Sequence, residues 1–160
     1  APSLGRNFGL EGWADFQPEL WQEECDRAQK RRRGDLNLPP LLGIEQDPLV
    51  AEQARVNIAA AGLEGVIEIR EGSFTEHDLP DGPGVLVCNP PYGQRIGEEE
   101  ELDHLYSALG GYVRQQASGW QLWLLSGNPK LTGGLRMKAS RRIPISNGGI
   151  DCRWLHYSIR

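Results

Sequence analysis

Short apolar runs alternate with longer stretches of helical periodicity along most of the chain. Strands are predicted where a run is apolar throughout or alternates with charged residues, at positions 41–44, 66–70, 84–88 and 121–126. Helices are predicted where apolar residues recur every three or four positions, at 19–32, 48–61 and 102–118, with a short helix or turn at 129–135. Strands that alternate with helices predict an α/β sandwich around a mostly parallel sheet.

Capping residues set the limits of the helix at 48–61. Asp47 is suited to cap its start, Pro48 to occupy its first position, and Gly62 to end it. The segment before this helix, Leu41 to Ile44, is apolar and short. Together these signals predict a strand, a tight turn and a helix.

Three other segments predict a buried strand, a hairpin and a loop. The run at 84–88 is apolar throughout, so we expect a buried central strand. Segments 137–145 and 152–159 alternate around an Asn-Gly-Gly turn and predict a closing antiparallel hairpin. Residues 1–18 show no period, and we expect a loop that Phe8 and Trp13 anchor.

Composition narrows the classes of function. The 160 residues fit one domain, and no apolar run approaches the ~18 residues of a membrane span, so no membrane partner is expected. Because the net charge is -5, any electrostatic attraction to nucleic acid must come from local basic patches or from parts outside this chain. The basic run at 30–33 favours helix capping, with RNA contact as the alternative.

Cysteine and histidine spacing points away from metal chemistry. Cys25, Cys88 and Cys152 lie far apart, so neither a zinc site nor a disulfide framework is expected. The three histidines show no spacing typical of metal ligands, so we expect no metal. Reduced thiols indicate a cytoplasmic protein.

The strongest chemical signal is Asn89-Pro90-Pro91-Tyr92, directly after the apolar run at 84–88. Ligands of doubly wound sheets bind beyond the carboxyl ends of the strands, where this tetrapeptide is expected. Two consecutive prolines fix the backbone and remove two donors. The Asn89 side-chain oxygen and the Pro90 carbonyl then remain as rigid acceptors, with the Tyr92 ring beside them.

This arrangement suits an exocyclic amino group of a nucleobase. Such a nitrogen is a poor nucleophile because its lone pair is delocalised into the ring. Two acceptors that bind its N–H groups localise the lone pair and stabilise the positive charge that develops during methyl transfer. Tyr92 can stack on a base that has left its helix. The alternative is a turn that only ends a strand, with Tyr92 packed on the surface.

Glu45, at the end of the strand at 41–44, gives a weaker signal. In nucleotide-binding α/β folds an acid at the end of the second strand hydrogen bonds the ribose hydroxyls. The alternative is a solvated turn residue.

Four stretches resemble one known family, the large-subunit rRNA guanine-N2 methyltransferases that carry a THUMP RNA-binding domain. Older names call such sequences N6-adenine-specific DNA methylases. The similar stretches, read in this chain, are APSLGRNF with Trp13 after it, GIEQD with Ala54 and Asn57, NPPYGQR, and NGGIDC. The resemblance runs almost end to end. NPPY alone occurs in adenine, cytosine, guanine and glutamine methyltransferases, and the Gly-x-Arg extension narrows it toward the rRNA group.

The resemblance implies roles for individual residues. Asn89, Pro90 and Tyr92 would hold the target base, and Pro91 and Arg95 would contact the substrate. Glu45 would bind the ribose of the cofactor, S-adenosylmethionine, and Asn89 would contribute to the same site.

Ser73 falls where the family usually has an Asp that contacts the cofactor adenine. Ser is a departure, because it can form one hydrogen bond there but lacks the carboxylate.

The second departure is larger. The family's glycine-rich cofactor loop and first strand have no counterpart in these 160 residues. The resemblance places that strand in mid-sheet, between the strands that end at Glu45 and Asn89, so two exposed edges are expected. We therefore expect the C-terminal part of a methyltransferase domain, completed by a longer chain or by the second copy of a homodimer. The THUMP domain is also absent.

The sequence thus predicts a Rossmann-like class I methyltransferase sheet with a C-terminal antiparallel hairpin. The expected function is transfer of a methyl group from S-adenosylmethionine to guanine N2 of ribosomal RNA. Adenine N6 methylation of DNA or RNA is the alternative. An alternative of another class is a non-catalytic fragment or nucleic-acid-binding module.

Overall fold

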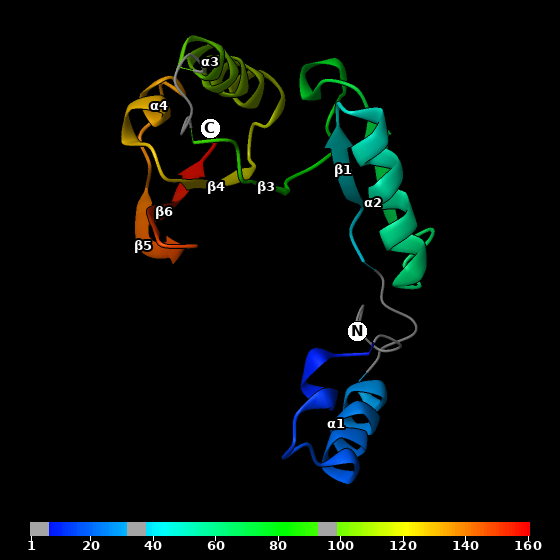
Figure 1. Ribbon diagram of the computed structural model, residues 1–160. Helices are drawn as coiled ribbons and strands as arrows, with labels where there is room; N and C mark the ends of the chain where they lie inside the picture. Colours follow the sequence, from blue (N-terminus) through cyan, green and yellow to red (C-terminus); the bar gives the residue numbers. More distant parts are fainter. Residues whose placement is uncertain (1–6, 32–37, 93–98) are drawn as a thin grey trace. The chain divides into compact units, whose positions relative to one another are not determined.

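The computed structural model describes residues 7–31, 38–92 and 99–160, which belong to two compact units, 1–74 and 75–160 (Figure 1). The first unit holds the elements η1 (Gly9–Gly12), α1 (Pro18–Lys30), β1 (Leu41–Glu45), α2 (Pro48–Ala60) and β2 (Ile67–Glu71), and η2 (Phe74–Glu76) spans the boundary. The second unit holds β3 (Val85–Cys88), α3 (Glu99–Gln116), β4 (Gln121–Ser126), α4 (Pro129–Gly133), β5 (Arg141–Asn147) and β6 (Ile150–Ser158).

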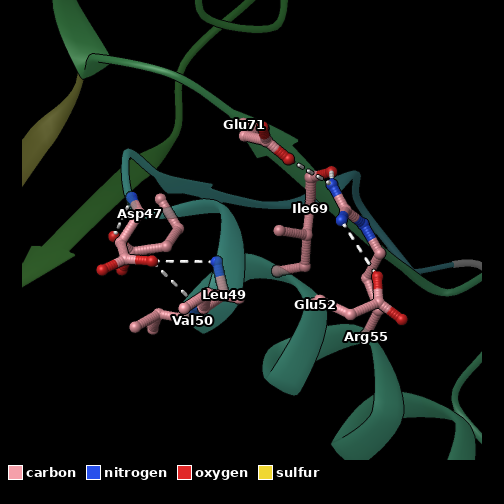
Figure 2. A network of polar contacts seen from close by, with 8 residues as sticks. Asp47, Leu49, Val50, Glu52, Arg55, Ile69 and Glu71 are labelled. Carbon is pink, nitrogen blue, oxygen red and sulfur yellow. Dashed lines mark hydrogen bonds and ion pairs between the residues drawn. The ribbon is translucent and has the colours of Figure 1, made fainter.

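In the first unit, β1 and β2 form a parallel pair joined by α2. The predicted caps of α2 are confirmed, because the Asp47 carboxylate accepts from the backbone N–H groups of Leu49 and Val50, at 2.8 and 3.3 Å (Figure 2). Gly62 follows the helix with a φ of 64°, and Leu63 N–H donates to the Ile58 carbonyl. That bond closes a Schellman motif, which glycine in the left-handed region allows.

The segment before α1 differs in part from its prediction. Phe8 packs edge-on against Trp21 of α1, with ring centroids 5.4 Å apart, so Phe8 is an anchor as expected. Trp13 is 68% exposed, and the prediction that it anchors this segment is wrong. It directly follows η1, a short 3-10 turn that the sequence reading missed.

In the second unit, four strands form a sheet in the order β3-β4-β6-β5. The β3–β4 pair is parallel, and β6 runs antiparallel to both β4 and β5. The core lies in this unit: Tyr106 and Val113 of α3 and Leu122 and Leu124 of β4 are fully buried. Gly110 permits a close approach between α3 and the end of α4, since an added Cβ would clash with the Leu135 backbone.

The closing hairpin is confirmed, with a shift at its start. Gly148 and Gly149 both have positive φ, 59° and 84°, as a two-residue type I′ turn requires. β5 begins at Arg141, whereas the alternation of the sequence predicted a strand from residue 137. Arg136, just before the predicted strand, has a φ of 51° in the left-handed region, and residues 136–139 have no regular secondary structure.

The strand at 84–88 is present, but it is not buried. β3 pairs only with β4 among the described residues, and Val85 and Val87 are 56% and 67% exposed. β1 likewise has β2 as its one partner within the described part of the chain. An apolar run therefore predicted a strand correctly, whereas the burial of that strand depends on the elements that pack beside it.

Candidate active site

The Asn-Pro-Pro-Tyr segment follows β3 at the carboxyl edge of the sheet in the second unit. β3 and β4 are parallel, so the residues after both strands reach the same edge. β6 is antiparallel to β4 and pairs Ser126 with Arg153, so the beginning of β6 and the hairpin turn lie there too. Three separate chain segments therefore meet around the tetrapeptide.

Within the tetrapeptide, the Tyr92 hydroxyl donates to Asn89 Oδ1 at 2.5 Å. Asn147, beside the hairpin turn, donates from Nδ2 to the same hydroxyl at 3.4 Å. Asn89 is exposed and Tyr92 partly buried. The Asn89 oxygen keeps a second lone pair, because an amide carbonyl can accept two hydrogen bonds.

Residues from α3 and from the loop after β4 hold the tetrapeptide in place. Asn128 Nδ2 donates to the Tyr92 carbonyl at 3.2 Å, and the Tyr106 hydroxyl donates to the Pro91 carbonyl at 3.4 Å. At Gly127, an added Cβ would lie 3.1 Å from the Tyr92 ring and 3.3 Å from Cys152 Sγ. A larger residue would therefore press on the ring.

Asn128 has a second structural task. Its Oδ1 accepts from Lys130 N–H at 3.0 Å and so caps α4, while its own N–H donates to Ser126 Oγ at 3.1 Å. One amide thus links the start of α4 to the tetrapeptide. The sequence reading missed this residue, although an Asn shortly after a strand and directly before a Pro is a recognisable helix cap.

Burial favours the protonated form of three groups at or near the tetrapeptide. Burial raises the pKa of Tyr106 to about 12 and that of the Cys88 thiol to about 11. Burial also raises the pKa of Tyr92, against the opposing effect of its hydrogen bond with Asn147. These side chains are neutral at physiological pH, so they suit acceptor and donor chemistry better than proton abstraction.

Two of the three predicted cofactor residues, Glu45 and Ser73, lie together in the first unit, and the third, Asn89, belongs to the second. Glu45 ends β1, and Ser73 follows β2 by two residues, at the carboxyl edge of the parallel pair. Gly72 N–H donates to the Glu45 carbonyl at 2.9 Å, which draws the two strand ends together. Glu45 Oε1 accepts from Asp47 N–H at 2.9 Å; the Glu45 residue is half-buried and Asp47 is exposed.

The structure thus forms two groups of predicted site residues, each within its own unit. Glu45 and Ser73 belong to the first, and the tetrapeptide Asn89, Pro90, Pro91 and Tyr92 to the second. Arg95 lies outside the described residues.

Comparison with known proteins decides between the possible families. Residues 1–156 match the UPF0020 family, described as RMKL-like, methyltransferase domain. The chain is also 39% identical over 162 residues to ribosomal RNA large subunit methyltransferase K/L of Marinomonas sp. (strain MWYL1). That alignment covers 96% of this chain and 22% of the relative. The chain belongs to the UPF0020 family.

Solved structures agree on the fold of this UPF0020 chain. A candidate methyltransferase crystallised with SAH superposes with a TM-score of 0.83 at 24% identity, over 100% of this chain and 42% of that one. A Listeria monocytogenes protein (str. 4b F2365), described as a predicted N6-adenine-specific DNA methylase, gives 0.79 at 26% identity, over 100% and 40%. The predicted methyltransferase-like α/β fold is confirmed. The chain spans well under half the length of each of these relatives.

The described part of this UPF0020 chain has neither a membrane-spanning helix nor a cluster of metal ligands. Its helices there are too short or too polar to cross a bilayer. No three His, Cys, Asp or Glu side chains gather there in a way that could hold a metal ion. Cys25, Cys88 and Cys152 are free thiols.

Proposed function

We propose that the protein containing this chain transfers a methyl group from S-adenosylmethionine to an exocyclic base nitrogen, guanine N2 of large-subunit ribosomal RNA. The observation that carries the proposal is the tetrapeptide after β3, with its exposed amide oxygen and fixed aromatic ring. Membership of the UPF0020 family and the rRNA methyltransferase K/L relative support the reaction and the substrate class.

The residues of the first unit fit one part of the cofactor. Glu45 uses Oε1 for the Asp47 N–H, and Oε2 has no hydrogen bond to any described residue. A carboxylate oxygen left available at a strand end suits a ribose diol, which has two hydroxyl donors. Ser73, at the neighbouring strand end, would contribute a single hydroxyl near the adenine. The bound cofactor would supply an electrophilic methyl group.

In the second unit, the tetrapeptide would bind and orient the target amino group. Asn89 Oδ1 and the Pro90 carbonyl would each accept one N–H, which directs the nitrogen lone pair toward the methyl donor. Asn89 Oδ1 already accepts from the Tyr92 hydroxyl, so the base would take its second lone pair or displace that bond. Tyr92 would stack on the base, and Pro91 and Arg95 would contact the substrate.

Adenine N6 is the second candidate acceptor. The Listeria protein is named for that chemistry, and the tetrapeptide suits any exocyclic amine. Analysis of nucleosides from the methylated product distinguishes the two, since a methylated adenine would refute the guanine assignment.

The edges of β1 and β3 that are unpaired within the described part of the chain suggest that the proposed function should be tested on the whole protein. β1 and β3 each have one strand partner among the described residues, and both would be covered in a complete domain. Residues 1–160 would then form the C-terminal part of a cytoplasmic methyltransferase domain. The missing strand would come from the same longer chain or from the second copy of a homodimer.

The test is Asn89→Ala in the whole protein, with an unmethylated rRNA transcript and labelled S-adenosylmethionine. Loss of one preorganised partner of the reacting group costs about 100- to 1000-fold in rate, and we expect a loss of that size. Glu64→Ala, in an exposed turn after α2, is the control and should retain full activity. If Asn89→Ala transfers methyl as fast as the parent, the tetrapeptide does not carry the reaction. The alternative of a non-catalytic binding module predicts that outcome.

A further inference from the structure

The positive charge of this chain is concentrated at its C-terminal end. Residues 130–160 contain one acidic residue, Asp151, and seven basic ones: Lys130, Arg136, Lys138, Arg141, Arg142, Arg153 and Arg160. This segment therefore carries a formal charge of +6, whereas the other 129 residues carry -11. All seven basic side chains are exposed. Such an asymmetry is typical of a surface that meets a polyanion.

A cleft of about 950 Å³ opens within this segment, between α4 and the β5–β6 hairpin. Its floor includes the buried side chains of Leu155 and Tyr157, and polar side chains such as that of Thr132 also line the cleft. Arg142 and Arg153 also line the cleft, with Asp151 as the one acidic lining residue.

The strand register places both arginines on one face of the hairpin. Arg142 pairs with Leu155, and Arg153 with Pro144, so the two arginines are diagonal neighbours across β5 and β6. Arg141 pairs with His156 and points to the opposite face, because successive side chains of a strand alternate. Arg141 is therefore a matched control for Arg142, because it has the same charge and points away from the cleft.

Neither cleft arginine is neutralised. Among the described residues, no ion pair or hydrogen bond joins the Arg142 or Arg153 side chain to another group. Burial raises the pKa of Tyr157, and the Arg142 guanidinium acts against that rise, which places its charge near the floor of the cleft. Two unpaired cations beside a floor that includes Tyr157 match a nucleotide, which has an anionic phosphate and a flat base.

The cleft adjoins the candidate active site. Arg153 pairs with Ser126 across β6 and β4, and Ser126 Oγ accepts from Asn128, the residue that holds the Tyr92 carbonyl. An RNA strand that presents its target base to the tetrapeptide would therefore continue along this cleft.

We propose that the cleft between α4 and the β5–β6 hairpin binds the single-stranded RNA that flanks the target nucleotide. Arg142 and Arg153 hold its phosphates, and a neighbouring base lies over the floor that Tyr157 helps to form. The proposal that this RNA flanks a methylated base rests on the proposed function, whereas the RNA contact itself does not.

The test measures binding of a fluorescein-labelled single-stranded oligouridylate to the whole protein by fluorescence anisotropy, without cofactor, over a range of salt concentrations. Arg142→Gln and Arg153→Gln should each lower the slope of log affinity against log salt by about 0.7, the value for one phosphate contact of a single strand. At 0.1 M salt this corresponds to a loss of affinity of roughly fivefold. Arg141→Gln should stay within about twofold of the parent, and Arg142→Lys should restore the slope.

Several outcomes separate this proposal from its alternatives. Equal effects of Arg141→Gln and Arg142→Gln on slope and affinity would overturn it. It would also fail if the arginine variants lost binding to phosphatidylglycerol vesicles and not to RNA, since the cleft would then face a membrane. Methyl transfer to rRNA provides a separate readout: the variants should raise KM for RNA and leave kcat unchanged. If the protein binds RNA through these arginines yet transfers no methyl group, the proposed function fails and the RNA site stands.

Discussion

The two units of the chain are held together in different ways. Fifteen of the sixteen buried hydrophobic residues in the described part of the chain lie in residues 75–160, and Ala51 alone represents the first unit. Two parallel strands and one covering helix cannot bury much apolar surface, whereas four strands with α3 and α4 can. The comparison teaches that the second unit brings its own core, and that the first buries little apolar surface within its described residues.

Polar contacts are correspondingly prominent in the first unit. Arg55 of α2 contacts Glu52 at 3.3 Å and Glu71 of β2 at 3.8 Å, and donates to the Ile69 carbonyl at 3.5 Å (Figure 2). Exposed pairs of this kind contribute little, typically about 0–1 kcal/mol each. They orient α2 on the strands without replacing a core.

The largest effect that the comparison predicts is loss of a core leucine. Leu122→Ala in β4 removes a fully buried side chain and should lower the free energy of unfolding by about 2–5 kcal/mol. Leu49→Ala in α2, where the side chain is 81% exposed, should change it by less than about 0.5 kcal/mol. Urea denaturation of the whole protein measures both. Similar losses for the two variants would contradict the contrast between the units.

The second-largest effect should be the pH dependence of the free energy of unfolding. The pKa values of Cys88 and Tyr106 are raised to about 11 and about 12, so both groups ionise more easily in the unfolded chain. Their contribution to stability is complete below the unfolded pKa and is lost as pH rises through the folded one. Unfolding free energy should thus fall by about 2 kcal/mol between pH 9 and 11 from Cys88 alone.

Cys88→Ala should flatten the profile between about pH 9 and 10 and leave the decline from Tyr106, between about pH 10 and 12. In the first unit a shift of opposite sign occurs at Glu68, where the hydrogen bond from Arg70 lowers the pKa of the carboxyl group. A parent profile that stays level from pH 9 to 11 would mean that Cys88 is not buried as a neutral thiol.

A third prediction separates positioning from folding at the tetrapeptide. Asn128→Asp keeps the oxygen that caps α4 and removes the Nδ2 donor to the Tyr92 carbonyl. Under the proposed function we expect kcat to fall roughly tenfold, the equivalent of about 1.4 kcal/mol, with KM for RNA and the melting temperature nearly unchanged. Asn128→Ala should lose both contacts and lower stability as well. Equal kcat values for parent and Asn128→Asp would show that this contact does not position Tyr92.

The smallest effect should come from the cap of α2. Asp47→Ala removes the acceptor for two backbone N–H groups and should destabilise the helix by about 1 kcal/mol. Hydrogen exchange should then quicken in α2 and stay as in the parent in α3. Gln46→Ala, exposed and one residue earlier, is the matched control and should leave exchange in α2 as it is.

The sequence by itself determined the order and type of the helices and strands, because local periodicity and capping are encoded over a few residues. The cap at Asp47, the type I′ turn at Gly148-Gly149 and the place of the tetrapeptide after β3 were all predictable. The family resemblance also lay in contiguous motifs, and it is confirmed.

Burial and long-range contacts were decided only by the tertiary structure. An apolar run such as 84–88 predicts a strand, but its exposed valines depend on which strands and helices lie beside it. The support of Tyr92 by Asn128, 36 residues away in sequence, and the facing of Arg142 and Arg153 into one cleft depend on strand register. Strand register depends on the packing of the whole sheet, because the sequence of one strand does not determine which residues of its neighbour lie opposite.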